Sequence, residues 1–294
     1  MDTISHPETP LARCSAQDAD ALTALTDLAL PGERLTTDEL LTLCFEDPDP
    51  SVVLALPDMT GAVALTCRSS VAYLQLLVVA PAQQGNGLGR ALLAAAEAWA
   101  AEEAAATTIV AGSAAPFYLW PGIDVRWTRS LAMFEAAGYR DRGAALNMSC
   151  PTTFRSPPPD GVTIARAIVD ADAEAALALA QAHWPNWVAE VTRAVDHGTC
   201  FLARSAGDGG DGGPAIGFAC HSVNRVGWVG PMATASNRRH AGVGGALLSA
   251  LCADLRAASL PDAEIAWVGP VGFYAKTAGA SVSRVFRVAN KQLG

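Results

Sequence analysis

The pattern of hydrophobic and polar positions along the chain predicts short strands mixed with amphipathic helices. Apolar runs of strand length stand at residues 51–56, 62–67 and 71–79, whereas residues 87–101 carry apolar positions at helical spacing. Turn-forming residues at 58–61 join the first two runs and predict a hairpin. Strands mixed with helices favour an α/β or α+β fold, in which helices flank a sheet.

The same rules predict the remaining elements. Further helices are expected at 16–30, 39–45, 127–137, 171–183, 187–195, 242–257 and 271–277. Further strands are expected at 11–13, 107–111, 162–165, 200–204, 215–220, 226–234 and 264–268, with another that ends at Met148. The glycine-rich residues 207–213 are expected to form a flexible hairpin loop, because no helix follows them.

The chain repeats itself at an offset of about 155 residues. Residues 84–93, which include two glycines and Ala-Leu-Leu, have a counterpart at 239–248. A second pair of similar segments, 11–21 and 164–173, occurs in the same order at nearly the same offset. Two motifs in matched order predict two lobes of one fold.

The proline-rich residues 151–160 predict the boundary between the lobes, because they suit neither a helix nor a central strand. The 294 residues agree with two domains. The expected division is residues 1–150 for the first lobe, 151–160 for a stiff linker and 161–294 for the second lobe.

Composition and charge exclude several classes of protein. Charged residues make up 17% and apolar residues 51% of the chain, which excludes a disordered protein. The net charge of −9, from 20 basic and 29 acidic residues, argues against a nucleic-acid binder. No apolar run is long enough to span a bilayer and the N-terminus has no signal-peptide pattern, so a soluble, cytoplasmic protein is expected. The seven scattered cysteines predict buried thiols rather than disulfides or a metal site.

A glycine-punctuated turn follows the strand that ends at Val79. Pro81 stops the strand, and the glycines of residues 85–89 open an amphipathic helix. Glycines let a ligand approach the backbone, and the first N–H groups of a helix attract anions, so the turn suits a pyrophosphate. Arg90 stands where a Walker loop needs lysine, and the motif lies mid-lobe rather than on a first strand, as a Rossmann fingerprint would. A helix start that merely contains glycines is the remaining alternative.

This motif resembles that of the GNAT family of acyl-CoA-dependent N-acyltransferases, Gln/Arg-x-x-Gly-x-Gly/Ala after a Val-x-Pro strand end. The first lobe matches it throughout; the second has Thr234 and Ser236 in place of the valine and proline. The resemblance covers residues 10–150 and 161–290. It implies two tandem GNAT lobes, each with a mixed, mostly antiparallel sheet flanked by helices.

The resemblance also implies acetyl-CoA as cosubstrate, with pantetheine along the strand end and pyrophosphate on the glycine turn of each lobe. The residues concerned are Leu77, Val78, Val79, Gln84, Gly85, Asn86, Gly87, Leu88, Gly89 and Arg90, and Met232, Ala233, Thr234, Arg239, His240, Ala241, Gly242, Val243, Gly244 and Gly245.

Members of this family usually protonate the leaving thiolate with a tyrosine of the last helix. Tyr274 matches that position, although the following glycine comes one residue late and Ala280 replaces the usual aromatic residue. In the first lobe Phe134 stands there and cannot donate a proton. The second lobe is therefore expected to be catalytic and the first to be structural, able still to hold coenzyme A. A core role for Tyr274 is the alternative.

The general base and the acceptor stay open. Candidate bases are His221, Glu190, Asp196 and His197, although a solvated side chain is the favoured interpretation of each. The aromatic residues 115–127 could form a lid or stack on a sugar, or could instead plug the interface between the lobes. This segment is similar to a tandem branch with glucosamine-type acceptors, which makes an amino sugar a candidate acceptor. Trp184, Pro185 and Trp187 offer a comparable aromatic wall in the second lobe.

The expected function is therefore transfer of an acetyl group to a primary amine of a small molecule, by direct attack in a ternary complex. The expected partner is the small-molecule amine, with no nucleic acid, membrane or metal. The oligomeric state is open, and a monomer fits because two lobes can pair internally. The alternative is a non-catalytic acyl-CoA-binding or sensing protein. A third candidate is a two-lobe synthase resembling mycothiol synthase.

Overall fold

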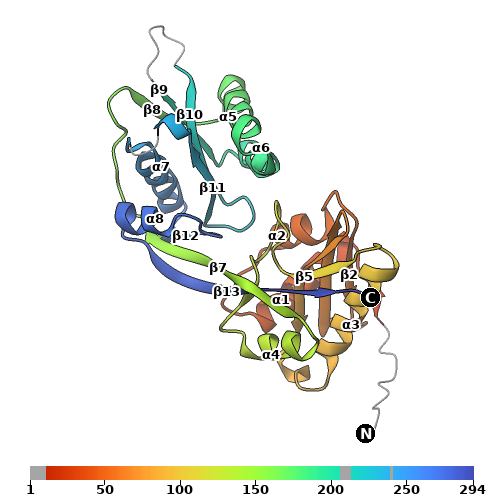
Figure 1. Ribbon diagram of the computed structural model, residues 1–294. Coiled ribbons are helices and arrows are strands. Elements are labelled where there is room, and N and C mark those ends of the chain that lie inside the picture. Colours follow the sequence, from red (N-terminus) through yellow and green to blue (C-terminus); the bar gives the residue numbers. More distant parts are fainter. Residues whose placement is uncertain (1–10, 206–212, 239–240) are drawn as a thin grey trace. The chain divides into compact units, whose positions relative to one another are not determined.

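The computed structural model describes residues 11–205, 213–238 and 241–294. The chain forms two compact units (Figure 1). The first, here called the first lobe, comprises Met1–Ala145 and Phe286–Gly294. The second lobe comprises Leu146–Val285.

Each lobe contains a mixed sheet with helices on it, as the sequence predicts. In the first lobe the strands are β1 (Ala12–Arg13), β2 (Ser51–Ala55), β3 (Gly61–Arg68), β4 (Val71–Val79), β5 (Thr108–Ala111) and β6 (Ile123–Asp124), and the helices are η1 (Ala16–Asp18), α1 (Ala19–Ala29), α2 (Thr37–Leu40), η2 (Leu41–Phe45), η3 (Pro81–Gln83), α3 (Leu88–Glu102) and α4 (Thr128–Ala136).

In the second lobe the strands are β8 (Val162–Arg166), β9 (Cys200–Ser205), β10 (Ala215–His221), β11 (Trp228–Thr234) and β12 (Asp262–Ile265), and the helices are α5 (Asp170–His183), η4 (Pro185–Trp187), α6 (Val188–Asp196), η5 (Ser236–Arg238), α7 (Val243–Ala257) and α8 (Val271–Ala278). Two long strands, β7 (Arg140–Pro151) and β13 (Ser281–Gln292), contribute residues to both units.

The two sheets have the same topology. Their strand orders are β1-β2-β3-β4-β5 and β8-β9-β10-β11-β12. All neighbours in these two series pair antiparallel except β4 with β5 and β11 with β12. Helices α3 and α7 both have 15 residues and start 155 residues apart. The repeat in the sequence is therefore a repeat of structure.

The sixth strand of each sheet comes from a distant part of the chain. In the first lobe the end of β13 pairs with β5, with Ala289 opposite Ala111 and Gln292 opposite Thr108. In the second lobe the end of β7 pairs with β12, with Met148 opposite Ile265. Strand β13 was not among the expected elements, and its pairing with a strand so distant in the sequence leaves no local signal.

The proline-rich residues 151–160, which the sequence marks as a linker, belong to the second lobe. Thr152 is fully buried, and its hydroxyl donates to the carbonyl oxygens of Leu260 and Pro261 at 2.7 and 2.8 Å. Phe154 packs against the hydrophobic core beneath α7. The division between the units falls instead after Ala145, within β7, and again after Val285, within β13.

Strand alternation divides the apolar side chains between the two faces of each sheet. In the first lobe Val63 and Leu65 of β3 face α3, whose Leu92 and Trp99 belong to the same core. In the second lobe one face of the sheet packs against α7 and α8. Phe218 of β10 lies on the other face, where it packs with α5 and α6. All seven cysteines are thiols, and all but Cys14 are buried.

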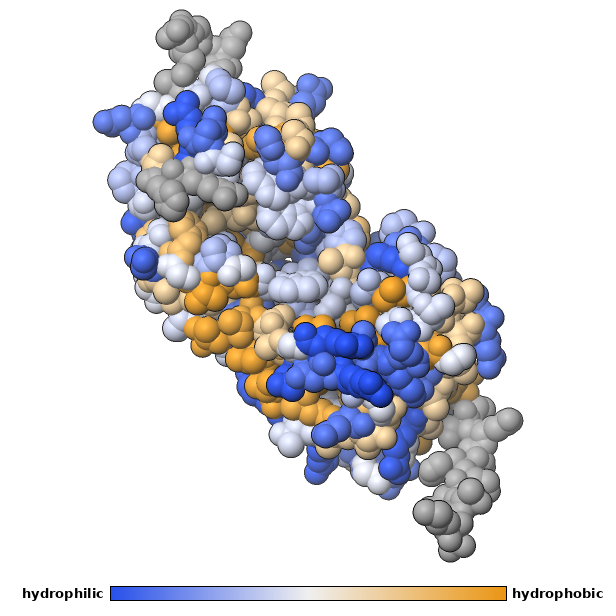
Figure 2. All heavy atoms as spheres, in the orientation of Figure 1, coloured by the Kyte–Doolittle hydropathy of each residue, from blue (hydrophilic) through white to orange (hydrophobic). Residues whose placement is uncertain are grey.

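The predicted elements are found within a few residues of the expected bounds. The main departure is at residues 41–45, where the expected helix is a π-helix, η2. Strands β9 and β10 pair antiparallel, as the hairpin predicts, but most of the loop at 207–213 lies outside the described residues. Figure 2 shows apolar residues intermixed with hydrophilic ones on the visible surface; the most exposed large apolar residues include Ile168 and Val226, and single exposed apolar residues are ordinary.

Candidate functional site

Both glycine turns have the same backbone geometry. Gly87 and Gly242 adopt left-handed φ angles of 84° and 82° and immediately precede α3 and α7. Because an L side chain strongly disfavours this conformation, glycine is required at both positions. The start of a helix leaves its first N–H groups without partners in the helix, and an anion site can use such groups.

The central strand of the first lobe has an open edge. Ala80 donates its N–H to Thr60, and because antiparallel bonding alternates, the peptide groups of Leu77 and Val79 point away from β3. The pairing of β4 with β5 ends at Leu74. A ligand chain could therefore bond to the Leu77 peptide and to the Val79 N–H as an added strand, as predicted for pantetheine, whereas the Val79 carbonyl oxygen accepts from Gln84.

The second lobe repeats this edge. Ala235 donates its N–H to Ile216, so the peptide groups of Met232 and Thr234 point away from β10. The register of β11 with β12 covers Trp228 and Val229. Both pairs of strands therefore splay apart before the glycine turn, at equivalent positions.

A β-bulge marks the point where each pair of strands diverges. In the first lobe Ala64 pairs with Leu76 and Leu65 with Leu74, so Gln75 is the extra residue. In the second lobe the corresponding shift falls at residues 230–231 of β11. The bulge bends the strand and opens space beside it.

That space in the first lobe is a cavity of about 60 Å³. It is lined by residues 74–77 of β4, by Trp120 and Trp127, and by Ser130 and Phe134 at α4. Since a buried water needs about 10–15 Å³ on this measure, the cavity has room for roughly four waters, or for a group the size of an acetyl thioester.

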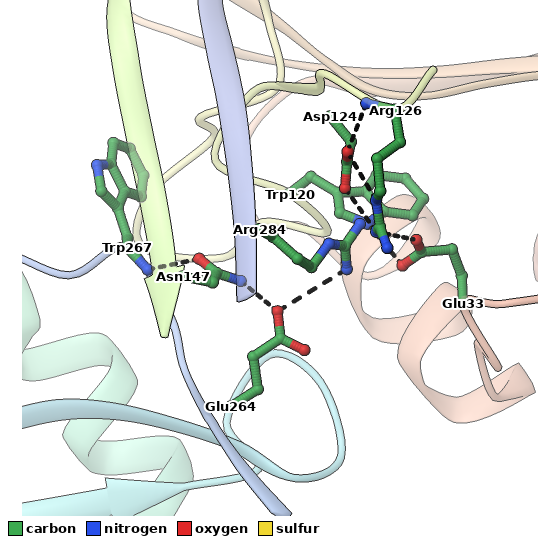
Figure 3. A network of polar contacts seen from close by, with 8 residues as sticks. All are labelled: Glu33, Trp120, Asp124, Arg126, Asn147, Glu264, Trp267 and Arg284. Atoms are coloured by element: carbon green, nitrogen blue, oxygen red, sulfur yellow. Dashed lines mark hydrogen bonds and ion pairs between the residues drawn. The ribbon is translucent and has the colours of Figure 1, made fainter. Parts of the chain in front are cut away.

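Two tryptophans form a corner of the cavity. The rings of Trp120 and Trp127 lie edge to face, with centroids 5.1 Å apart and planes at 87°. Trp120 is 5% exposed, and its Nε1 donates to Glu33 Oε2 at 3.1 Å (Figure 3). The aromatic segment predicted as a lid or a plug therefore supplies a buried wall of the cavity.

An ion-pair network borders this corner. Arg126 bonds the carboxylate of Asp124 through two nitrogens, at 2.9 and 2.7 Å, and Asp124 is fully buried. Arg126 also lies 3.8 Å from Glu33 (Figure 3). These charge-assisted bonds fix the segment that carries Trp120 and Trp127.

Figure 3 also shows a polar network of the second lobe. Asn147 donates through Nδ2 to Glu264 Oε1 at 2.5 Å, and its Oδ1 accepts from the backbone N–H of Trp267 at 2.9 Å. Arg284 lies 3.8 Å from the same carboxylate oxygen of Glu264. Because Asn147 is fully buried, this network reads as structural support for β7 and β12.

Cationic side chains flank the glycine turn of the first lobe. Arg129 of α4 donates to Gln84 Oε1 at 3.1 Å, while Gln84 Nε2 donates to the carbonyl oxygen of Val79 at 3.0 Å. Arg90 is exposed in the first turn of α3. At the repeat offset its counterpart in the second lobe is Gly245, which carries no charge. Arg238 and Arg239 precede the second turn in the sequence, so basic residues accompany both turns.

The two glycine turns differ in what lies against them. A Cβ placed on Gly85 of the first turn would meet nothing within 4 Å. In the second turn a Cβ on Gly242 would lie 3.2 Å from Pro159 Cγ, and one on Gly245 would lie 3.1 Å from Ser156 Oγ. The proline-rich segment therefore lies against the second turn and narrows the space in front of it.

The predicted acid of the second lobe is buried. Tyr274 of α8 is 6% exposed and packs in the core with Cys150 and Phe273. Burial raises the pKa of Tyr274 to about 12, which keeps the phenol protonated. In the first lobe Phe134 is buried and lines the cavity.

The structure separates the four candidate bases. His221 is held between Asp254 (2.8 Å) and the Ser222 hydroxyl (3.0 Å), and burial lowers the pKa of His221. Glu190 is buried, accepts from Asn224 at 3.3 Å, and burial raises its pKa to about 8. The other two, Asp196 and His197, are exposed at the end of α6.

The aromatic wall expected in the second lobe is partly a core feature. Trp184 and Trp187 stack with centroids 6.0 Å apart, and Trp184 meets Phe218 edge to face at 5.7 Å. Both tryptophans pack against the core under α5 and α6. This packing accounts for the aromatic cluster without a ligand.

In each lobe the described residues predicted to bind the cofactor lie on the end of the central strand and on the glycine turn that follows it. Arg239 and His240 lie outside the described residues. Sequence reasoning did not identify Gln75, Arg129 or Ser130, since a bulge and the angle of a helix leave no pattern in one sequence. No described helix is long and apolar enough to cross a membrane. Among the described residues no cluster of side chains could ligate a metal.

Comparison with known proteins agrees with this geometry. Residues 21–118, within the first lobe, match the model of the Acetyltransferase (GNAT) family. A search of curated proteins found no match.

Three solved structures share the fold over nearly the whole chain. The glucosamine N-acetyltransferase region of a fungal multi-domain GH3 β-N-acetylglucosaminidase is 19% identical with a TM-score of 0.74; the match covers 99% of this chain and 39% of that one. A GCN5-related N-acetyltransferase from Sphaerobacter thermophilus is 18% identical with a TM-score of 0.70, covering 98% and 97%. A tandem GNAT protein from the clavulanic acid biosynthesis pathway is 16% identical with a TM-score of 0.70, covering 97% and 98%.

The match of the first lobe to the family model and the repetition of its fold in the second lobe lead to one conclusion. Residues 21–118 carry a GNAT-family domain, and the chain as a whole has the fold of a tandem GNAT protein.

Proposed function

We propose that the first lobe transfers an acetyl group from acetyl-CoA to a primary amine of a small molecule. The observation that carries the proposal is that one lobe combines an open glycine turn, an open strand edge and a cavity at the bulge. From Val79 to Gln75 the strand rises about 13 Å, a length that the extended pantetheine arm of coenzyme A can span. Pyrophosphate on the turn would therefore bring the thioester to the cavity.

The cavity supplies what direct transfer needs. The neutral amine nitrogen attacks the acetyl carbonyl carbon, the new C–N bond forms, and the C–S bond breaks to release the coenzyme A thiolate. The amine loses one proton and the thiolate takes up one. Ser130 lines the cavity, and its hydroxyl is assigned to donate a hydrogen bond to the departing sulfur. No covalent acyl-enzyme is formed.

The second lobe is the other candidate for the chemistry. Tyr274 favours it, since a phenol can protonate the thiolate and Phe134 cannot. Two observations favour the first lobe instead: Pro159 lies against the second glycine turn, and Tyr274 is buried in the core. All residues of the proposed site belong to one lobe, so a single chain suffices.

The acceptor is proposed to be an amine carried on a ring or another body with an apolar face. The perpendicular indole rings of Trp120 and Trp127 offer two apolar surfaces for such a group to pack against. Aromatic ring faces also attract cations. An amino sugar is the first candidate. The fungal region that shares the fold is a glucosamine N-acetyltransferase, and at 19% identity it supports the choice of assay only.

The test is an acceptor screen with acetyl-CoA as donor. Glucosamine, other amino sugars and simple aliphatic amines are each incubated with the full-length chain, and both free thiol and N-acetylated product are measured. We expect stoichiometric release of thiol and formation of amide with at least one amine. Binding of acetyl-CoA without transfer to any amine would support the alternative, a non-catalytic acyl-CoA-binding protein.

A further inference from the structure

Gln75 carries a buried amide at the point where β4 and β5 diverge. It is the extra residue of the β4 bulge and is 2% exposed. A primary amide taken out of water costs several kcal/mol unless it is hydrogen-bonded. Its partners therefore show what the residue holds in place.

Both ends of the Gln75 amide bond to the aromatic segment. Nε2 donates to the carbonyl oxygen of Phe117 at 2.8 Å, and Oε1 accepts from the backbone N–H of Leu119 at 3.3 Å. The far end of the same segment is held by Ser113, whose hydroxyl donates to Pro121 at 2.6 Å. The peptide between these two anchors carries Trp120.

We infer that Gln75 is a positioning residue for the acceptor, because it fixes the segment 116–120 so that the Trp120 indole walls the cavity. The inference rests on the proposed transferase function of the first lobe. Gln75 joins the strand that carries the thioester to the wall that meets the acceptor, so a loss of the bonds loosens the wall and leaves the acetyl-CoA contacts of the glycine turn unchanged. The residue acts through Trp120.

Three variants separate this role from general stability. Gln75→Ala removes both bonds. Gln75→Glu keeps an acceptor for Leu119 but sets a carboxylate oxygen against the Phe117 carbonyl. Lys291→Met is the control, because it removes the 2.7 Å ion pair to Glu97 in the same lobe without touching the segment.

For each variant, hydrogen exchange of residues 116–121, the Kd for acetyl-CoA, and kcat and KM for the acceptor are measured. We expect faster exchange and an acceptor KM about tenfold higher in Gln75→Ala, the order expected for lost buried hydrogen bonds. The Kd for acetyl-CoA should stay within about twofold. The acceptor KM of Gln75→Glu, divided by that of the wild type at the same pH, should decrease as the pH is lowered. A protonated carboxyl can again donate to the carbonyl oxygen of Phe117. Lys291→Met should match the wild type in exchange of the segment and in KM.

The outcomes separate the two proposals. Unchanged exchange of residues 116–121 in Gln75→Ala would show that Gln75 does not hold the segment. Faster exchange with an unchanged acceptor KM would overturn the positioning role. A wild-type chain that acetylates no amine would overturn the proposed function instead, and the exchange measurement would still decide whether Gln75 holds the segment.

Discussion

Gly87 and Gly242 stand 155 residues apart and adopt the same left-handed backbone, with φ angles of 84° and 82°. Each immediately precedes a helix of 15 residues, yet their surroundings differ. The first turn faces open space at Gly85, whereas Pro159 lies against Gly242 in the second turn. One fold thus occurs twice in the chain, and the proline-rich segment lies against only one of its two glycine turns.

The first prediction concerns the group that assists the leaving thiolate. Ser130→Ala should lower kcat about tenfold, because one hydrogen bond to developing charge is lost, while the Kd for acetyl-CoA stays unchanged. Tyr274→Phe should leave kcat within about twofold, because Tyr274 packs in the core of the other lobe. Steady-state kinetics with the best acceptor measures both. A large loss of kcat in Tyr274→Phe alone would move the chemistry to the second lobe.

The second prediction concerns the strand that completes the first sheet. Deletion of residues 286–294 removes the fully buried Phe286 and the end of β13 that pairs with β5. Hydrogen exchange at β5 should therefore become much faster, while β9 and β10 of the second lobe keep their protection. Removal of Gly294 alone is the control and should change neither. Unchanged exchange at β5 after the longer deletion would contradict the pairing.

The third prediction concerns pH and the second lobe. Burial raises the pKa of Glu190 to about 8 from an ordinary value of 4.5. The folded state thus favours the protonated acid, so its contribution to stability is complete below pH 4.5 and is lost as pH rises through 8. Glu190→Gln should remove this loss. The Tm of the variant minus the Tm of the wild type should therefore increase from pH 5 to pH 8.5. The corresponding gain in the free energy of unfolding over this pH range is about 4 kcal/mol, because the two pKa values of Glu190 differ by about 3.5 units.

A matched control for that measurement replaces Glu174, which is exposed on α5. Glu174→Gln should give a curve of Tm against pH parallel to that of the wild type. If Glu190→Gln is also parallel, Glu190 is not a buried acid with a raised pKa.

Local elements could be predicted from the sequence because their signals are local. The apolar run 71–79 gave β4 at its observed bounds, and the glycine motif gave the starts of α3 and α7 within one residue. The repeat gave the two lobes. These signals depend on period, turn chemistry and capping, which operate over a few residues.

Long-range relationships could not be predicted. The pairing of β13 with β5 joins Ala289 to Ala111, and nothing near either residue encodes it. The contact of Pro159 with Gly242 depends on how the proline-rich segment packs, whereas composition alone suggested a stiff linker. Gln75 reads as one polar residue in an apolar strand, and only the bulge shows why it is buried and bonded.

The most direct test of the central claim is calorimetric titration of acetyl-CoA into the wild-type chain and two matched variants. Asn86→Glu and Ala241→Glu place a carboxylate at equivalent exposed positions of the first and second glycine turns. The account predicts one site per wild-type chain, at least about tenfold weaker in Asn86→Glu by charge repulsion and unchanged in Ala241→Glu. Two sites per wild-type chain, or a loss of binding in Ala241→Glu alone, would contradict it.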